Sequence, residues 1–547
     1  MDKRATCRKI LRKTALSVLA ASILMTGTVD AVRAEETPNV LQTVEAESGT
    51  LLGKAKIAAT GTCVSGLEHT GDGVEVTVTV PEDGLYDIIV RTAVIGGGTK
   101  VNEVNANGQH VGDITNSGSW SDEVVPYVWL EAGDNTVSVT TSYGWIAVDS
   151  FSIRRAAPLP ADVYEVKPTL INPNATDSAK RLMTYLCDQY GKTVLSGQQS
   201  QDGAFGLTNA AVWRGTGGDY PAVLGMDLIS YSPARVAKGD NSSNVVERAI
   251  EYWNGDEGKR GIVTLCWHWC PAARYDKSKS DPWGTFYTDK TKFNLARAMN
   301  GRDPDGYQML LDDIDAIAVQ LKRLQDADVP VLWRPLHEAS GAWFWWGLQG
   351  RDSATNEVFQ KLWYMIYDRL ENYHKLTNII WVWNGQNPHT AIHPNAFDIE
   401  GIDRYYDQED ISAEALSTYY EKCYGELAGY DKYCAELAGM DSTGKMMALT
   451  ECGYIPDPDG IKAANTMWLY YMVWNGDFIY ETDAAGKAMV DLNGTPHPNP
   501  KKGITNEMLA EYFSNDLYIT HNKLPEFSFG VREIPQQIKN WEYFRIG

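Results

Sequence analysis

Cysteine and basic residues are both scarce in this chain. Only 8 of the 547 residues are Cys, too few for the dense disulfide framework that stabilises small secreted domains. Lys and Arg together number 49, against 71 Asp and Glu, which gives a formal net charge of −22. A chain with this balance lacks the basic surface that binds nucleic acids or anionic membranes, so we expect neither as a partner.

Seven Cys follow Cys7, which lies in the first segment of the chain. An odd number leaves at least one thiol unpaired. Cys266 and Cys270 are four residues apart, but no second pair of ligands accompanies them to complete a zinc site. We expect most of the seven to be buried free thiols. Cys423 and Cys434 could form a disulfide, which the sequence does not decide.

Two widespread hydrolase signatures are also missing. The chain has no His-Glu-x-x-His pair of zinc ligands. It has no Gly-x-Ser-x-Gly turn to carry a serine nucleophile either. These absences argue against the common zinc and serine hydrolases.

The first 34 residues have the pattern of a secretory signal peptide. Basic residues gather at positions 3–13, a short apolar stretch follows at 15–28, and small residues stand at Val32 and Ala34, where a signal peptidase reads. The apolar stretch is too short for a membrane span, and no other apolar run of that kind follows. We expect residues 1–34 to be removed and the mature chain to be secreted, without insertion into a membrane.

Residues 40–155 carry the period-two pattern of β-strands. Residues 74–80 alternate apolar and polar side chains, and so do residues 136–139. Turns rich in Gly, Asp and Asn, such as 71–73 and 107–108, separate the segments. Many short strands of this spacing are typical of a β-sandwich. Residues 156–175 contain four Pro without clear periodicity, which predicts a linker.

Between residues 176 and 547, apolar strand-like runs alternate with helix-like segments. One helical segment, residues 310–326, places Leu311, Ile314 and Leu321 on a single face. The apolar runs occupy residues 193–199, 222–228, 261–269, 330–338, 378–385, 397–405, 446–453 and 467–476. Eight strand–helix repeats predict an α/β fold, a (β/α)8 TIM barrel, which the β-sandwich precedes.

Polar and Trp residues stand at the carboxyl ends of several of these runs, where the working residues of a barrel lie. They are Trp-His-Trp at 267–269, the segment 334–338, Asp-Arg-Tyr at 403–405, Thr-Glu at 450–451 and Trp-Asn-Gly at 474–476. The chain also has 18 Trp, whose flat faces suit either a core or the apolar faces of sugar rings.

Glu338 and Glu451 end the fourth and seventh runs, so they would face each other across a barrel of eight strands. Retaining glycoside hydrolysis needs such a pair about 5–5.5 Å apart, one carboxyl protonated for the leaving oxygen and the other ionised to attack the anomeric carbon. The plainer alternative for Glu338 is a structural carboxylate paired with Arg334.

The fourth run carries the most specific motif. Arg-Pro-Leu-His-Glu at 334–338, followed by Gly341 and by Trp-Phe-Trp-Trp-Gly at 343–347, resembles the acid/base signature of glycoside hydrolase family 26. Residues 401–405 and 449–451 resemble the sixth-strand and nucleophile motifs of that family. The resemblance covers residues 176–547 and implies an endo-acting β-1,4-mannanase that cleaves β-mannan polysaccharide with retention and needs no cofactor for catalysis. We also expect a monomer.

Carried over position by position, the resemblance makes Glu338 the acid/base and Glu451 the nucleophile. His337 and Tyr405 would support the pair by hydrogen bonding, and Asp403 would hold the polar network of the site.

The same resemblance implies that Trp343 and Trp474 line the subsites beside the scissile bond. His268 would bind sugar on the non-reducing side, where Trp283 would stack. Trp343 and residues 345–346 cannot all face one cleft, because neighbouring side chains diverge. We expect Trp343 to face the cleft and at least one of the others to pack in the core.

The β-sandwich has its own resemblance. Val-Glu-Ala-Glu at 44–47 and Trp-Ile-Ala-Val-Asp-Ser-Phe at 145–151 resemble the first and last strands of carbohydrate-binding module family 35. The resemblance implies a structural calcium ion held by Glu45, Glu47 and Asp149, since oxygen ligands suit a hard cation. It also makes Trp145 a candidate sugar contact, with the glycan left open.

Other functions fit the same residues. An exo-acting mannanase would differ in the loops that close one end of the cleft, for which 235–257 and 408–445 are long enough. A β-1,3-xylanase or a mixed-linkage glucanase would keep both Glu and change the subsites. A non-catalytic glycan-binding protein is a more remote alternative.

Overall fold

The computed structural model describes residues 39–143, 145–157, 161–200, 206–242, 244–255, 261–278, 283–347 and 353–525. The expected signal peptide, residues 1–34, lies outside this range. Within the described residues, no helix is both long enough and apolar enough to cross a lipid bilayer.

The amino-terminal domain is a sandwich of two antiparallel sheets, as the sequence predicts. One sheet has the order β3 (Lys56–Ile57), β4 (Val64–Ser65), β11 (Ile146–Arg155), β6 (Gly84–Val94), β9 (Ser121–Leu130). Strand β1 (Val40–Glu45) also pairs with β11. The other sheet has the order β2 (Thr50–Leu52), β5 (Gly73–Val80), β10 (Gly133–Tyr143), β7 (Lys100–Ala106), β8 (Gln109–Asn116).

The period-two pattern of the sequence is what holds these sheets together. In β5 the residues Val74, Val76, Val78 and Val80 are all buried. They share one apolar cluster with residues of the facing sheet such as Phe151. The turn at 107–108 joins β7 to β8, and both Asn107 and Gly108 have positive φ, at 49° and 76°. This conformation is the one that Asn-Gly sequences favour in tight hairpins.

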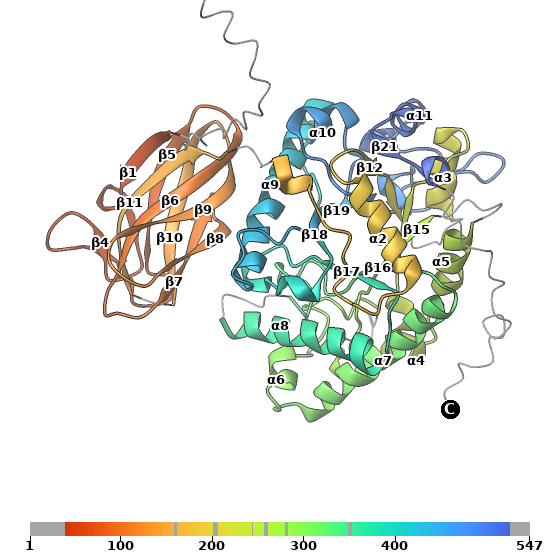
Figure 1. Ribbon diagram of the computed structural model, residues 1–547, viewed down its shortest axis with the longest axis horizontal. Coiled ribbons are helices and arrows are strands. Elements are labelled where there is room, and N and C mark those ends of the chain that lie inside the picture. Colours follow the sequence, from red (N-terminus) through yellow and green to blue (C-terminus); the bar gives the residue numbers. More distant parts are fainter. Residues whose placement is uncertain are drawn as a thin grey trace, which may run out of the picture. The chain divides into compact units, whose positions relative to one another are not determined.

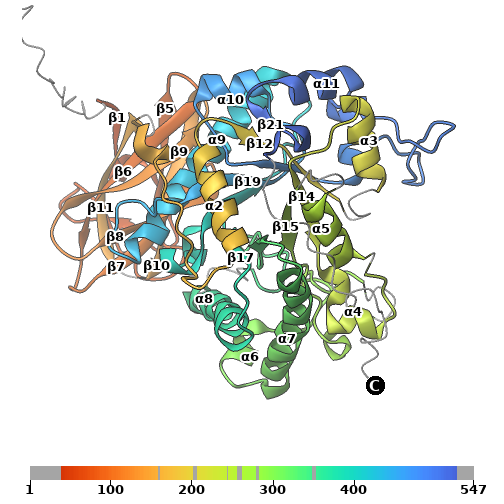
Figure 2. The ribbon, with the colours of Figure 1, turned by 45° about the vertical axis from the view of Figure 1, so that its right-hand side comes forward.

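The second domain is a closed barrel of eight parallel strands, in chain order (Figures 1 and 2). The strands are β13 (Gly197–Gln199), β14 (Val223–Asp227), β15 (Ile262–Cys266), β16 (Val331–Arg334), β17 (Ile379–Trp383), β18 (Ile399–Arg404), β19 (Met446–Cys452) and β20 (Tyr471–Val473). Each lies within one of the eight predicted runs, so the barrel prediction is confirmed. These strands are buried almost throughout, as expected of strands covered on both faces.

Helices surround the barrel strands (Figure 2). They are α2 (Asp177–Gln189), α3 (Leu207–Thr216), α4 (Pro233–Ala237), α5 (Val245–Asn254), α6 (Leu295–Met299), α7 (Pro304–Asp326), α8 (Ser353–Tyr367), α9 (Ala413–Glu436), α10 (Pro458–Ala464) and α11 (Asn506–Ser514). Helix α7 begins before the predicted residue 310, because Asp303 caps the backbone of Gly306 at 3.0 Å and Pro304 fits the first turn.

Two segments outside the eight repeats are also fixed to the barrel. Strand β12 (Val194–Leu195) pairs in parallel with β21 (Tyr518–Ile519), so the first predicted run supplies two short strands. Tyr164, in the predicted linker, packs on the barrel core, and its hydroxyl accepts a hydrogen bond from Met467 N at 3.1 Å. The later part of the 156–175 segment is therefore held in place.

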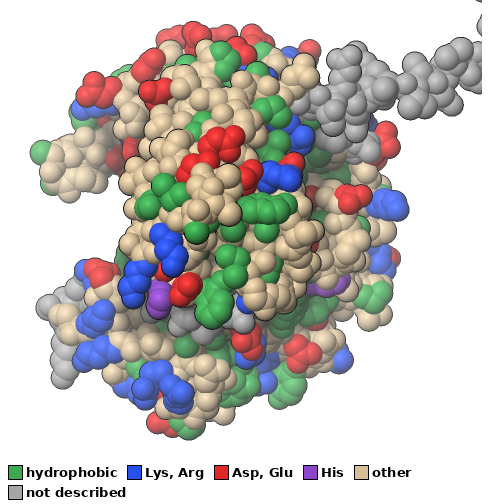
Figure 3. All heavy atoms as spheres, turned by 90° about the vertical axis from the view of Figure 1, so that its left-hand side faces the viewer, with side chains coloured by type: hydrophobic (Ala, Val, Ile, Leu, Met, Phe, Trp, Pro, Cys, Tyr) green, Lys and Arg blue, Asp and Glu red, His purple; other side chains and the backbone are tan. Residues whose placement is uncertain are grey.

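The sequence predicts buried free thiols for most of the seven Cys after Cys7; all seven are free, and all but the half-buried Cys187 are buried. Cys423 and Cys434 are not joined. Acidic, basic and hydrophobic side chains are all exposed on the face shown in Figure 3.

Candidate active site

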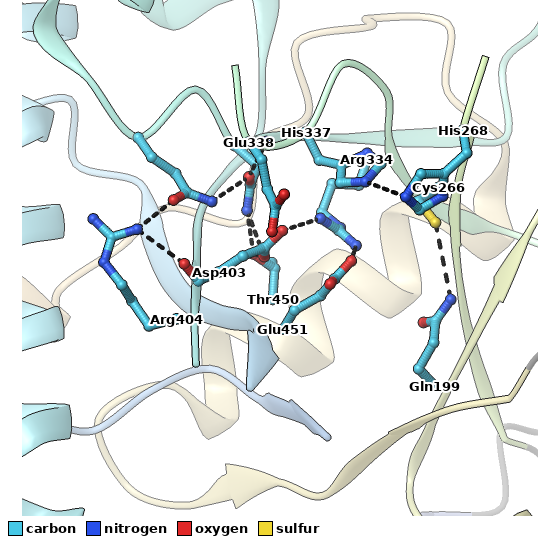
Figure 4. Close-up of polar contacts among 12 residues, drawn as sticks. Gln199, Cys266, His268, Arg334, His337, Glu338, Asp403, Arg404, Thr450 and Glu451 are labelled. Atoms are coloured by element: carbon cyan, nitrogen blue, oxygen red, sulfur yellow. Dashed lines mark hydrogen bonds and ion pairs between the residues drawn. The ribbon is translucent and has the colours of Figure 1, made fainter. Parts of the chain in front are cut away.

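The polar groups predicted at the strand ends meet at the carboxyl end of the barrel (Figure 4). Strand β16 ends at Arg334, and the chain then makes a tight turn that presents Glu338. Leu336 and Glu338 both have positive φ, at 53° and 54°, a conformation that residues with a Cβ rarely adopt. Such backbone strain persists only where the surrounding structure holds it, and it concentrates at functional sites.

Glu451 is the carboxylate with the stronger partners. It is buried near the end of β19, where Arg334 donates to its Oε1 and the Tyr405 hydroxyl donates to its Oε2 at 2.7 Å. Arg334 also donates to Asp403 Oδ2 at 2.6 Å. The plainer alternative, in which Arg334 pairs with Glu338, is therefore wrong: the guanidinium pairs with the opposite glutamate.

A bulge in β19 positions the residues around Asp403. The register of β18 against β19 shifts between Ile402 and Asp403, so Thr450 has no partner residue of its own. Its hydroxyl donates to Asp403 Oδ1 at 2.6 Å. Gly401 makes room for this side chain, because a Cβ there would lie 2.7 Å from Thr450 Oγ1.

Asn384, which follows β17, ties this network to the acid/base candidate. Its Nδ2 donates to Asp403 Oδ1 at 2.8 Å, and its Oδ1 accepts from the Glu338 backbone N at 2.9 Å. Gln386 Nε2 donates to the same oxygen at 2.8 Å and thereby fixes the orientation of the amide. One side chain thus connects the turn after β16 with the polar groups of β18 and β19.

Charge balance assigns the protons within the site. Carboxylate oxygens of Glu338, Asp403 and Glu451 lie within 4.8 Å of one another. Three negative charges this close repel strongly in a buried site, so at least one carboxyl keeps its proton. Arg334 stabilises the ionised forms of Asp403 and Glu451 by direct contact. These contacts therefore favour Glu338 as the carboxyl that keeps the proton.

Burial raises the pKa of both carboxyls, so their direct contacts are what distinguish them. Burial, and after it the charge of Asp403, raises the pKa of Glu338 to about 7. Burial and Asp403 raise the pKa of Glu451 to about 8, whereas Arg334 and the Tyr405 hydroxyl act against that rise. Of the two carboxyls, Glu451 has the direct contact with Arg334, and retaining hydrolysis needs two carboxyls that differ in this way at one pH.

The Trp residues of the fourth-strand motif divide as expected. Trp343 is 48% exposed and donates from Nε1 to Glu338 Oε2 at 2.7 Å, while Trp345 and Trp346 are 1% and 0% exposed. Gly341 lies under the Trp343 ring, since a Cβ at that position would come within 2.2 Å of a ring carbon. Trp343 therefore offers an open face beside the acid/base candidate.

Trp474 and Trp283, the other two Trp predicted to contact sugar in the barrel domain, differ in their surroundings. Trp474 is half-buried, and its ring centroid lies 6.4 Å from that of His268, which places it at the site. Trp283 is 44% exposed, and the Arg235 guanidinium lies over its ring at 4.7 Å from the centroid. One face of Trp283 is thus covered by Arg235.

His268 and His337 lie beside each other in the buried part of the site (Figure 4). Their Nε2 atoms are 3.2 Å apart, and His268 Nδ1 is 2.6 Å from Asp227 Oδ2. Both ring nitrogens of His268 thus have protein partners. Direct sugar binding by His268, which the resemblance implies, would need one of these bonds to yield.

Asp227, Asn384 and the contact of Arg334 with Glu451 were not predicted from the sequence. Asp227 ends β14, and Asn384 follows the last residue of β17. Both therefore stand at the carboxyl ends of predicted runs, the second and the fifth, which is the signal that locates polar residues at this end of a barrel.

The structure only partly assembles the predicted calcium ligands of the sandwich. Glu47 Oε2 is buried without a hydrogen-bond partner. The pKa of the Cys63 thiol is raised first by burial and then by the charges of Asp149 and Glu47. Both carboxylates therefore lie near that thiol. Glu45 is exposed at the end of β1. Within the described residues, the sets of potential ligand atoms closer than 4.8 Å do not include these three acids together.

Trp145, the candidate sugar contact of the sandwich, is 50% exposed. Its Nε1 donates to Glu68 O at 3.4 Å, which orients the ring, and the Ile95 backbone N donates to Trp145 O at 2.9 Å. An exposed indole whose ring N–H and backbone carbonyl are both hydrogen-bonded has the features of a flat surface on which a sugar ring can stack.

Comparison with known families matches both domains. The family described as "Glycosyl hydrolase family 26" matches residues 171–493, and "Carbohydrate binding module (family 35)" matches residues 42–156.

Individual proteins match most of the chain. A mannan endo-1,4-beta-mannosidase of Thermothelomyces thermophilus is 38% identical over 461 residues, covering 83% of this chain and 88% of that one. Mannan endo-1,4-beta-mannosidase B of a Piromyces species is 33% identical over 506 residues, covering 89% of this chain and 78% of its own. Among solved structures, the Podospora anserina GH26-CBM35 beta-(1,4)-mannanase is 33% identical with a TM-score of 0.53, covering 88% of this chain and 98% of that one.

Proposed function

Since this chain belongs to glycoside hydrolase family 26, we propose that it is an endo-acting β-1,4-mannanase that hydrolyses mannan-type polysaccharides with retention of configuration. The observation that carries the proposal is the pair Glu338 and Glu451, whose carboxylate oxygens approach within 4.8 Å and of which Glu451 has the direct contact with Arg334. Such an approach suits the short separation of retaining enzymes better than the roughly 6.5–9.5 Å of inverting ones.

In the first step, Glu451 acts as the nucleophile and attacks the anomeric carbon of the bound mannose. The bond from that carbon to the leaving sugar breaks, and Glu338 gives its proton to the departing oxygen. Trp343 holds the Glu338 carboxyl through its indole N–H. Arg334 and Tyr405 hold Glu451 in position until its charge is consumed in the new ester bond.

In the second step, Glu338 is ionised and acts as a base. It takes a proton from a water molecule, which attacks the same anomeric carbon and breaks the ester bond to Glu451. Two inversions at one carbon restore the original configuration. Glu338 regains its proton and Glu451 regains its charge. Hydrolysis by enzymes of this family needs no cofactor.

The subsites follow from the aromatic residues of the barrel. Trp343 and Trp474 would contact the sugars on either side of the scissile bond. Trp283, backed by Arg235, would stack a further sugar on its open face. Asp403 would maintain the polar network, while His337 would support the acid/base turn.

For the rest of the chain we propose residues 40–155 as a carbohydrate-binding module, residues 156–175 as the connection and residues 176–547 as the catalytic domain. The pattern of residues 1–34 supports export, so we propose a secreted monomer whose polysaccharide partner lies outside the cell.

The module would also hold a structural calcium ion. The buried and unpartnered Oε2 of Glu47, close to Asp149, supports a cation there, and Glu45 would turn inward to complete the carboxylate set. Addition of a chelator should then lower the melting temperature of the wild-type chain. The Glu47→Gln variant should melt lower without chelator and respond little to it. An equal response of both proteins to the chelator would count against the site.

The activity is tested by incubating the mature chain with linear β-1,4-mannan, β-1,3-xylan and mixed-linkage glucan and following the products over time. Endo-action predicts an early mixture of manno-oligosaccharides, a newly formed β-anomer in the product and no release by Glu451→Ala. Early release of one short product would instead indicate exo-action. Cleavage of xylan or glucan alone would overturn the substrate, and binding without any cleavage would favour a glycan-binding protein.

A further inference from the structure

The turn that presents Glu338 needs several anchors, because Leu336 and Glu338 both have positive φ. Three anchors act on its backbone. Asn384 Oδ1 accepts from Glu338 N at 2.9 Å, Trp346 Nε1 donates to His337 O at 2.9 Å, and Gly341 N donates to Glu338 O at 3.1 Å. The fourth anchor is the side chain of His337, the central residue of the turn.

The side chain of His337 reaches Asp227 through one intermediate. His337 Nε2 lies 3.2 Å from His268 Nε2, and His268 Nδ1 lies 2.6 Å from Asp227 Oδ2. All three residues are buried. Figure 4 shows His268 and His337 side by side, away from the carboxylates of Asp403 and Glu451. The contacts therefore run from Asp227 at the end of β14, through His268 just after β15, to His337 in the turn after β16.

Only some placements of the ring hydrogens are compatible with these contacts among Asp227, His268 and His337. The Asp227 carboxylate is an acceptor, so His268 carries a hydrogen on Nδ1. In the neutral His268 ring, Nε2 is then an acceptor, and His337 must donate from its own Nε2. Burial, His268 and Arg334 lower the pKa of His337 well below its ordinary value, so His337 is neutral and its Nδ1 carries no hydrogen. His337 Nδ1 is buried without a hydrogen-bond partner, so no acceptor is present to hold a hydrogen on that nitrogen.

The orientation of Asp227 is itself fixed. Its Oδ1 accepts from the backbone N of Ile229 at 2.8 Å and from that of His268 at 3.1 Å. These donors cannot change role. Replacement of Asp227 by Asn would therefore leave the amide oxygen on the two backbone donors and turn the amide NH2 toward His268 Nδ1. His268 would have to move its hydrogen to Nε2, where it would face the Nε2–H of His337.

We propose that Asp227 is a positioning residue for the reaction, acting through His268 on His337. By fixing the hydrogen on His268 Nδ1, it makes His268 the acceptor that holds the side chain of His337, and thereby holds the strained turn with Glu338 in place. This inference rests on the acid/base role proposed for Glu338. It gives His268 a task for each ring nitrogen that involves no sugar.

The test compares two substrates that differ in their need for an acid. Mannotetraose has a poor leaving group and needs protonation by Glu338, whereas a dinitrophenyl β-mannobioside leaves with little help. For Asp227→Asn we expect kcat/KM on mannotetraose to fall about 10-fold more than kcat/KM for the first step on the aryl substrate. The mannotetraose loss should lie in kcat rather than in KM. Equal losses on both substrates, or no loss, would overturn the proposal.

Two further variants separate the possible failures. Asp398→Asn is a matched control, because Asp398 is also a buried acid that accepts from two backbone donors, Ile171 N and Trp381 N, but has no histidine partner. It should leave the ratio of kcat/KM on mannotetraose to kcat/KM on the aryl substrate unchanged. Glu338→Ala removes the acid itself and should show the full fall in this ratio. If it does not, the acid/base role itself fails. If it does and Asp227→Asn does not, only the role of Asp227 fails.

A measurement on the unaltered chain keeps the proposal testable if Asp227→Asn does not fold. Nitrogen-15 NMR of histidine-labelled protein reports which ring nitrogens carry hydrogen, and the His337 signals are assigned by their loss in His337→Gln. We expect hydrogen on Nδ1 of His268 and on Nε2 of His337. Hydrogen on Nδ1 of His337 would overturn the proposal.

Discussion

The guanidinium of Arg334 donates directly to the carboxylate of Glu451 in the buried part of the barrel. This contact distinguishes the two catalytic candidates, since a fixed positive charge beside one carboxylate favours its ionised form. The opposite carboxyl, Glu338, has an indole as its side-chain partner and is left to hold the proton.

Replacement of Arg334 by Lys should raise the pKa of Glu451, because the ammonium group cannot contact both Glu451 and Asp403 in the way that the guanidinium does. The acidic limb of the pH profile of kcat/KM should move to higher pH, and activity at pH 5 should fall by about 10–100-fold. Arg369→Lys is the matched control, since Arg369 pairs with Asp315 through two donors away from the site. An unmoved acidic limb in Arg334→Lys would argue against the role of Arg334.

The alkaline limb of the same profile should report Glu338. The pKa of this carboxyl is raised to about 7, and the protonated form is the active acid. Activity on mannan should therefore decline as pH rises through about 7. In Glu338→Ala, assayed on a substrate with an activated leaving group, this decline should disappear, because no acid is left to titrate. A limb that persists unchanged would have to come from another group.

Azide should distinguish the two glutamates by the product that it forms. In Glu338→Ala the nucleophile is intact, so azide replaces water in the second step and gives a β-mannosyl azide. In Glu451→Ala azide takes the place of the missing nucleophile and gives an α-mannosyl azide. Proton NMR of the product reads the anomer directly. Exchanged anomers would reverse the two assignments.

Buried Asp313 should make the protein less stable as pH rises. Burial raises the pKa of this carboxyl to about 7 from its ordinary value of 3.8, so the folded state binds the proton more tightly than the unfolded state does. The stabilisation is complete below about pH 4 and is lost as pH rises through about 7. Between pH 5 and pH 8, the free energy of unfolding should fall by about 1–3 kcal/mol more in the wild type than in Asp313→Asn.

Urea unfolding at the two pH values measures this difference. Asp312→Asn is a suitable control, because Asp312 is the exposed neighbour on the same helix. It should keep most of the wild-type pH dependence, because burial is a larger cause of the raised pKa of Asp313 than the charge of Asp312. If Asp313→Asn also keeps the full pH dependence, the carboxyl is not the source of it.

Trp145→Ala should weaken binding of the mature chain to insoluble mannan while turnover of soluble manno-oligosaccharides stays unchanged. The reason is that an exposed indole can stack on a sugar of the solid polymer, and Trp145 belongs to the module rather than to the barrel. Pull-down with mannan and an oligosaccharide assay measure the two effects separately. Trp129 provides a control for the loss of a Trp, because it is half-buried and lies on β9, the edge strand of the sheet that contains β11. Unchanged retention on mannan by Trp145→Ala would exclude this ring as the contact.

The sequence predicted the barrel well, because its strands are buried on both faces and must be apolar runs. It also predicted where chemistry would lie, because parallel strands place their carboxyl ends at one edge, and Glu338 and Glu451 both stand there. Divergence of neighbouring side chains predicted that Trp343, Trp345 and Trp346 could not all face one cleft, and the family resemblance selected Trp343. These are local or periodic properties, which a single chain carries in its order of residues.

The partners of these residues were decided only by the tertiary structure. Nothing in the spacing indicates that Arg334 crosses the barrel to Glu451, or that a bulge in β19 turns Thr450 onto Asp403. The contact between His268 and His337 likewise joins residues 69 positions apart, and their shared hydrogen depends on Asp227. Residue order determined which side chains reach the end of the barrel, since strand period and burial are local. Closure of the barrel determined which of them touch, and hence which carboxyl keeps its proton, since charges interact through space and not along the chain.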